Sequence, residues 1–161
     1  MDDRKRSVIA FVLLKIALRD EYDIIDIPEF VYNDFGKPSI PNLPIHFSLS
    51  HCKDAVACAV YNNNIGIDIE SVVPYNPDIA HRVCTENELE KLQQSEHKDI
   101  DFIKLWTMKE AVSKYEGKGV SLPFSQIKMS EYSIFTKLSE NAKYALSTCN
   151  LTEIDIKYVD F

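Results

Sequence analysis

Two carboxylates stand two positions apart in the run IGIDIE at residues 65–70. The alternation of apolar and polar types predicts a strand, in which every second side chain shares a face. Asp68 and Glu70 should therefore project together, while the isoleucines face the core. Adjacent carboxylates repel each other unless water or a cation neutralises them. Mg²⁺ meets that need and keeps positions for substrate phosphates, although a solvated strand face is the commoner explanation of such a pair.

A third carboxylate candidate lies in the run WTMKEAVSK at residues 106–114, which is predicted to be helical. Glu110 and Lys114 are four residues apart and so share one face of that helix. Glu110 could supply another ligand to a metal, and Lys114 could meet a phosphate oxygen. The ordinary alternative is an exposed ion pair, which contributes only about 0.3–0.5 kcal/mol. Taken alone, the segment favours that alternative.

Two shorter motifs could also touch a phosphate. Ser50 and His51 end a predicted strand, where a hydroxyl and an imidazole can hydrogen-bond a phosphate or transfer a proton. No acidic residue at the spacing of a catalytic triad accompanies them, which argues against a serine hydrolase. Gly36, Lys37 and Pro38 form a predicted tight turn that presents one cation. Each motif is weak by itself.

The elements that must position these residues are short strands and helices in an order that predicts an α+β fold. Three asparagines at 62–64 signal a turn, so residues 55–70 are predicted to form a β-hairpin. Thr85 and Glu88 fit a capping box that opens one helix. Expected helices span residues 4–20, 77–83, 86–95 and 100–116. Expected strands span residues 23–31, 45–50 and 55–61, with three more near 126–135, 143–149 and 153–159.

The first helix could be mistaken for a signal peptide, because basic residues precede an apolar run at 8–14. Lys15 interrupts this apolar stretch, and no small-residue cleavage motif follows. The apolar residues recur near the helical period instead, which predicts an amphipathic core helix capped by Asp2 or Asp3. The residues of that predicted apolar face are Val8, Phe11, Val12, Ile16 and Ala17. No run approaches the roughly 20 apolar residues of a membrane span.

The composition is that of an ordinary globular protein. The chain has 161 residues, of which 45% are hydrophobic and 27% charged, enough for one domain or two small, closely packed lobes. The net charge of −7 argues against a nucleic-acid partner, because a general polyanion binder needs a basic face. The four cysteines form no CxxC pair and are expected to be reduced thiols in a cytoplasmic protein. No membrane partner is expected.

The order of the motifs is more specific than any one of them. The motifs are FSLSH at 47–51, NIGIDIE at 64–70, and WTMKEA at 106–111 followed by Lys114 and EGKG at 116–119. In this order the chain resembles the 4′-phosphopantetheinyl transferases, from about Asp3 to Pro123. The GKP turn, Trp106 ahead of the Lys-Glu pair, and the run EGKGVSLP resemble the larger, Sfp-like class more than the short trimeric holo-acyl-carrier-protein synthases.

That resemblance implies a fold and a reaction. The fold would be 4′-phosphopantetheinyl transferase-like, with two similar lobes, each a small antiparallel sheet packed on helices, and an active site between them. The lobes are expected at residues 1–66 and 67–161, the first one truncated relative to the family. The reaction would be Mg²⁺-dependent transfer of 4′-phosphopantetheine from coenzyme A to a serine of an apo acyl or peptidyl carrier protein, releasing adenosine 3′,5′-bisphosphate.

The resemblance also implies roles for the acidic residues. Asp68, Glu70 and Glu110 would ligate Mg²⁺ together with the coenzyme A diphosphate and water, so that the metal polarises the phosphorus under attack. Lys114 would bind the diphosphate. Glu110 would also act as general base toward the carrier serine, directly or through water, which makes Glu110 and Lys114 the expected catalytic pair.

By the same resemblance, Ser50 and His51 would contact phosphates of coenzyme A, and Lys37 and Pro38 would lie beside its adenine.

Near the N-terminus, Arg6 would bind the 3′-phosphate, with Arg4 and Lys5 as alternatives. Glu88 corresponds either to an acidic position of the family near the metal or only to the capping box with Thr85.

The shortened first lobe is expected to expose sheet edge and apolar surface, which self-association or a rearranged edge would cover. This expectation applies if the chain is naturally short; the alternative is that its start is misassigned. Two other functions stay open: a protein that binds coenzyme A without transfer, and a non-enzymatic acidic interaction module.

Overall fold

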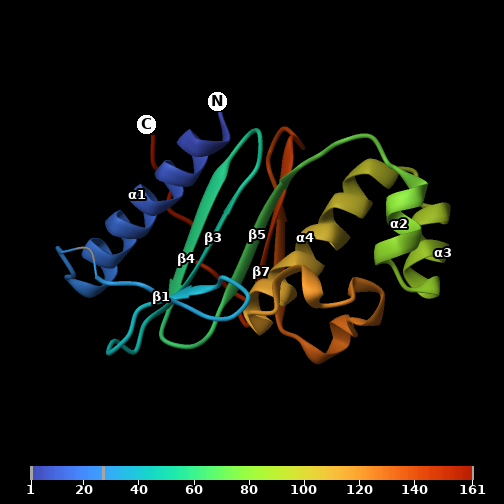
Figure 1. Ribbon diagram of the computed structural model, residues 1–161. Coiled ribbons are helices and arrows are strands. Elements are labelled where there is room, and N and C mark those ends of the chain that lie inside the picture. Colours follow the sequence, from blue (N-terminus) through green and yellow to red (C-terminus); the bar gives the residue numbers. More distant parts are fainter. Residues whose placement is uncertain (1, 27, 161) are drawn as a thin grey trace.

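Helices and short antiparallel strands alternate along the chain in a computed structural model, which describes residues 2–26 and 28–160 (Figure 1). The helices are α1 (Asp3–Tyr22), α2 (Pro77–Val83), α3 (Glu86–Gln94) and α4 (Lys98–Glu116). The strands are β1 (Val31–Tyr32), β2 (Pro38–Ser39), β3 (His46–His51), β4 (Val56–Tyr61), β5 (Gly66–Ser71), β6 (Ile134–Leu138) and β7 (Tyr144–Cys149). Three 3₁₀ turns lie at Gly119–Ser121, Phe124–Gln126 and Met129–Glu131. The predicted α+β class is confirmed.

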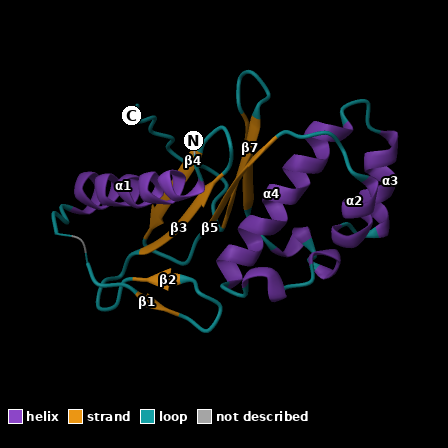
Figure 2. Ribbon diagram, turned by 45° about the horizontal axis from the view of Figure 1, so that its top comes forward, coloured by secondary structure: helices purple, strands orange, loops and turns teal. Residues whose placement is uncertain are grey.

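The described strands form three small antiparallel sheets, with strand orders β1-β2, β3-β4 and β5-β7-β6. The second and third sheets meet along β3 and β5. Two serine hydroxyls join these strands: Ser48 Oγ accepts from the amide of Ile67 at 3.1 Å, and Ser50 Oγ accepts from the amide of Ile69 at 3.2 Å. β3 and β5 therefore run side by side in the same direction, joined by side chains in place of a backbone ladder (Figure 2).

The predicted hairpin over residues 55–70 is wrong. β4 pairs with β3 and β5 pairs with β7, each antiparallel. Asn64, in the expected turn, donates through Nδ2 to the carbonyl of Tyr115 at 2.6 Å. The asparagine segment is thus hydrogen-bonded to the end of α4 and connects β4 to the sheet of β5, β7 and β6.

Helix α1 begins as predicted but presents a different face to the core. The side chain of Asp2 caps it by accepting from the amide of Arg4 at 2.8 Å. Its buried residues are Ala10, Leu14 and Leu18, and the helix packs on β3 and β4. On the predicted face, Val8, Phe11 and Val12 are 62%, 42% and 39% exposed. The helix therefore has two apolar stripes. The sheet of β3 and β4 covers the stripe of Ala10, Leu14 and Leu18 and leaves the other one exposed.

Three other predicted strands differ from the structure. In the segment 23–31 only Val31 is in a strand, while Ile27 lies outside the described residues. Asp23 ends α1 in the left-handed conformation with φ 56°, which turns the chain sharply. Of 126–135, only the last two residues are in a strand, after two 3₁₀ turns. Residues 153–159 form no strand, and Lys157 there pairs with Glu21 of α1.

Helix α4 is the centre of the C-terminal half, where it packs on β5 and β7. Gly66, the first residue of β5, permits this contact, because a Cβ there would lie 2.0 Å from the carbonyl oxygen of Ala111 and 2.6 Å from the amide nitrogen of Tyr115. Helices α2 and α3 cover the other side of α4 (Figure 1). None of the described helices is long and apolar enough to cross a membrane.

Candidate active site

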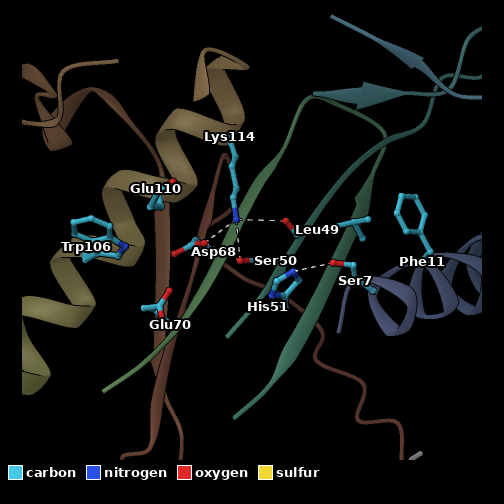
Figure 3. A pocket seen from close by; sticks show the side chains of 11 residues that line it. Ser7, Phe11, Leu49, Ser50, His51, Asp68, Glu70, Trp106, Glu110 and Lys114 are labelled. Carbon is cyan, nitrogen blue, oxygen red and sulfur yellow. Dashed lines mark hydrogen bonds and ion pairs between the residues drawn. The ribbon is translucent and has the colours of Figure 1, made fainter. Parts of the chain in front are cut away.

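A cavity of about 410 Å³ lies where α1, β3, β5 and α4 come together (Figure 3). Its lining is Ser7, Ala10 and Phe11 from α1, Leu49, Ser50 and His51 from β3, Asp68 and Glu70 from β5, and Trp106, Glu110 and Lys114 from α4. The size is within the usual range for small-molecule sites. Six of the residues predicted to act in the site line this one cavity.

The alternation along β5 places its carboxylates as the sequence predicts. Asp68 and Glu70 line the cavity, while Ile67 and Ile69 are buried in the hydrophobic cluster on the other face. Glu110 approaches from α4, a separate element (Figure 3). Three carboxylates from two elements therefore border one pocket.

Asp68 is the most buried of the three, with 5% of its surface exposed. Its Oδ1 accepts from Lys114 Nζ and from Ser50 Oγ, both at 2.7 Å. Its Oδ2 is buried and has no hydrogen-bond partner. Leaving a buried carboxylate oxygen unsatisfied is costly, so this atom is suited to accept a cation or a donor from a ligand.

Burial raises the pKa of Glu70 and of Glu110, and the negative charge of Asp68 raises both further. The amide of Ser71 at Glu70, and Lys114 at both residues, oppose the increase. A cation among these carboxylates would stabilise their charged forms, and oxygen ligands of this kind suit Mg²⁺. In the described part of the chain, however, no three metal-ligating side chains are already gathered around one point.

Lys114 links the two sheets at the site. Its Nζ donates to Ser50 Oγ at 2.8 Å and to the carbonyl of Leu49 at 3.4 Å, as well as to Asp68. The ion pair of Lys114 with Asp68 is thus a partly buried contact between elements, unlike the exposed pair that the helix spacing alone would favour. The ammonium lies where it could also meet an anion entering the cavity.

The other end of the cavity is formed by α1 and β3. His51 Nε2 lies 3.2 Å from Ser7 Oγ, and its Nδ1 lies 3.8 Å from Asp3 Oδ1. Ser7 was not among the predicted site residues, and nothing in its local sequence distinguishes it. Ala10, Phe11 and Leu49 give this end an apolar wall.

Three predicted coenzyme A contacts do not line the cavity. Arg6 precedes the cavity residue Ser7, and its Nη2 pairs with Asp3 Oδ1 at 3.1 Å. The ammonium of Lys37 lies at the C-terminal end of α4, and Pro38 is in β2. Their contacts with a nucleotide stay predictions.

Glu88 has a structural place. It forms the predicted capping box with Thr85, accepting from its amide at 2.7 Å. Its carboxylate also pairs at 2.8 Å with Lys109 Nζ, whose side chain is fully buried and also donates to the carbonyl of Phe124. Glu88 is not among the cavity residues. It therefore supports the segment of α4 that carries Glu110.

The fold and the pocket together define a class: an α+β protein with carboxylates that suit a hard cation beside a lysine and a histidine that suit a phosphate. A family model described as ACPS, the 4′-phosphopantetheinyl transferase superfamily, matches residues 64–150. This match covers more than half of the chain, and the chain belongs to that superfamily.

Individual relatives agree with the predicted Sfp-like class. The 4′-phosphopantetheinyl transferase Sfp of Bacillus subtilis (strain 168) is 40% identical over 128 residues, which cover 76% of this chain and 56% of that protein. The 4′-phosphopantetheinyl transferase psf-1 of Bacillus pumilus is 34% identical over 148 residues, or 89% of this chain and 60% of that protein. The chain thus spans less than two thirds of the length of these relatives.

Among solved structures, the holo-[acyl-carrier-protein] synthase of Thermotoga maritima aligns with a TM-score of 0.44 and 17% identity over 53% of this chain and 61% of that chain. A likeness of that degree adds nothing to the assignment.

Proposed function

We propose that this protein transfers 4′-phosphopantetheine from coenzyme A to a serine of an apo acyl or peptidyl carrier protein, with Mg²⁺ as cofactor and adenosine 3′,5′-bisphosphate as the leaving product. The observation that carries the proposal is the buried, unpartnered Oδ2 of Asp68 in a carboxylate-lined pocket of a chain that belongs to this superfamily. Coenzyme A and the carrier protein would be its partners, in the cytoplasm.

The residues of the pocket would divide the work. Asp68, Glu70 and Glu110 would hold Mg²⁺, which when bound would neutralise charge on the diphosphate and polarise the phosphorus. Lys114 would bind a diphosphate oxygen through its ammonium. A carboxylate oxygen of Glu110 would take the proton of the carrier serine.

The remaining contacts would hold the nucleotide end. Ser50 and His51 would bind phosphates, and His51 is already oriented by Ser7. Arg6 would reach the 3′-phosphate. Lys37 and Pro38 would lie beside the adenine, which requires the nucleotide to extend beyond the cavity.

A second copy of the chain would cover the apolar stripe of α1 that the fold leaves exposed. Val8 and Val12 form the part of this stripe that lies outside the cavity, and among the described strands none pairs with the outer edge of β4.

The test is to incubate the protein with coenzyme A, Mg²⁺ and several apo carrier proteins, and to measure the mass of each carrier. The proposal expects a gain of one phosphopantetheine that is lost when a chelator removes Mg²⁺. Binding of coenzyme A without a gain on any carrier would favour a binding protein without transfer activity. Neither binding nor gain would favour an acidic interaction module.

Asp68→Ala sharpens the test, because Asp68 contributes to no helix cap and its side chain faces the cavity. Transfer should fall by at least about a hundredfold, because loss of a group that only supports a metal ligand already costs about 10–100-fold, while circular dichroism stays that of a folded protein. Asp78→Ala, at an exposed position of α2, is the matched control and should keep full transfer. Near-normal transfer by Asp68→Ala would contradict the metal assignment.

A further inference from the structure

Lys37 extends from a stiff turn between β1 and β2. Asn33 Oδ1 accepts from the amides of Phe35 and Lys37 at 3.0 and 2.8 Å, and Gly36 takes the left-handed conformation with φ 83°. The ladder of β1 with β2 closes the turn behind them. The backbone from which the lysine side chain extends is therefore fixed.

The ammonium of Lys37 is shared among three acceptors on other segments. Its Nζ donates to Asn64 Oδ1 at 2.7 Å, to the carbonyl of Tyr115 at 3.2 Å and to the carbonyl of Ile65 at 3.3 Å. An ammonium has three donors, and here each has an acceptor. The same turn makes a second contact with this region, because Asn33 Nδ2 donates to the carbonyl of Gly117 at 2.8 Å.

One of these acceptors, the carbonyl of Tyr115, belongs to the last turn of α4. Such carbonyls have no partner within the helix, and the helix dipole makes this end negative. The ammonium of Lys37 and the side-chain amide of Asn33 supply hydrogen-bond donors to these carbonyls, and the ammonium also supplies a positive charge. The β1–β2 hairpin reaches toward this end of α4 in Figure 2.

The position costs the lysine its hydration. Burial lowers the pKa of Lys37 to about 8, although the neighbouring Cys149 and Glu116 act in the opposite direction. Burying a charge is unfavourable unless it is well paired. The proposed place of Lys37 beside the adenine does not require this ammonium, which already has three acceptors, so its burial calls for another role.

That role concerns Lys114, the residue before Tyr115. Lys114 precedes it in the same helical turn and must reach across to Ser50 and Asp68. Asn64 also donates to the carbonyl of Tyr115, and Asn150 in turn donates to the carbonyl of Asn64 at 2.9 Å. The direction of Lys114 depends on how firmly this last turn is held.

We propose that Lys37 is a positioning residue, a latch that ties the turn 33–37 to the C-terminal end of α4 and thereby holds Lys114 against Asp68 and Ser50. The latch depends on the proposed function in one respect only, which is that the ligand of Lys114 is a diphosphate. Any contact of this segment with a nucleotide base then comes from its backbone and from Pro38, since the ammonium is engaged at the helix end.

The first test measures the latch without a ligand. In Lys37→Met, which keeps an apolar stem and removes the ammonium, the amides of residues 113–118 should exchange with deuterium at least about tenfold faster, since a hydrogen bond to a charged group contributes about 1.5–3 kcal/mol. Lys143→Met, at an exposed position of the β6–β7 loop, should leave that exchange unchanged. Unchanged exchange in Lys37→Met would overturn the proposal.

The second test measures its effect on the site, by calorimetry on folded protein with Mg²⁺. Inorganic pyrophosphate and coenzyme A should both bind Lys37→Met more weakly by a similar factor, about tenfold, because both depend on Lys114. Loss of affinity for coenzyme A alone would identify a base contact and overturn the latch. Faster exchange with both affinities unchanged would show that Lys37 stabilises the end of α4 without positioning Lys114, and this result would also overturn the latch. If the wild type binds neither probe, the proposed function fails, and the exchange result alone decides the latch.

Discussion

The ion pair of Glu88 with Lys109 supports the site from outside the cavity. Lys109 is the residue before Glu110, yet its side chain points away from the cavity to Glu88 and the carbonyl of Phe124. Its side chain is fully buried. A buried ammonium without its carboxylate would be left with one hydrogen bond and no counter-charge, which is far more costly than losing an exposed ion pair.

Glu88→Ala should therefore lower the free energy of unfolding by roughly 3 kcal/mol, the lower end of the cost of removing one partner from a buried ion pair. Urea denaturation measures it. Glu90→Ala, on the same helix but exposed, should change the free energy of unfolding by less than about 0.5 kcal/mol. Equal effects of the two substitutions would show that the Glu88–Lys109 pair contributes no more than an exposed charge.

At the scale of elements, the contact of β5 with α4 is the one on which the cavity depends. The strand supplies Asp68 and Glu70, the helix supplies Glu110 and Lys114, and Gly66 lets their backbones approach. The atoms that a Cβ at this glycine would meet are backbone atoms of α4, which cannot rotate away. The distance between the acidic strand and the acidic helix is thus set by the absence of one methyl group.

Gly66→Ala should destabilise the protein by roughly 3 kcal/mol, at the top of the usual range for an overpacked core, and should also reduce the proposed transfer by separating the carboxylates. Gly36→Ala is the matched comparison, because a Cβ there meets nothing within 4 Å and φ is 83°. Its cost should be only the left-handed backbone strain of about 1–2 kcal/mol. Thermal unfolding that ranks Gly36→Ala as the more harmful change would contradict the close approach of β5 and α4.

At the scale of the whole molecule, the C-terminal segment returns to the first helix. Lys157 pairs with Glu21, and Tyr158 accepts a hydrogen bond from Lys137 at 3.4 Å. Figure 1 shows the two ends of the described chain near each other beside α1. The C-terminal segment leaves Val8 and Val12 exposed. The proposed second copy would pack on these two residues.

Mass measured by light scattering should therefore increase with protein concentration. Replacing Val8 and Val12 together by glutamine should weaken the association by at least about tenfold, since burial of a valine side chain contributes about 1.5 kcal/mol or more. Val73→Gln, at another exposed valine, should have no effect. A monomer at every concentration of the wild type would refute self-association.

The sequence by itself determined what depends on neighbours along the chain. The alternation at 65–70 gave the shared face of Asp68 and Glu70, and the caps of α1 and α3 followed from Asp2 and Thr85. The motif order gave the family. These features are local because hydrogen bonds within a turn, and the side-chain period of a strand, involve residues only a few positions apart.

Only the tertiary structure decided which segments meet. It paired β5 with β7 instead of β4, buried the alanine-leucine stripe of α1, and brought Ser7 to His51. It also turned Lys114 toward Asp68 and Lys37 toward the end of α4, across 46 and 78 positions of sequence. Such contacts depend on which faces pack most closely once all elements are present, and no local pattern records that competition.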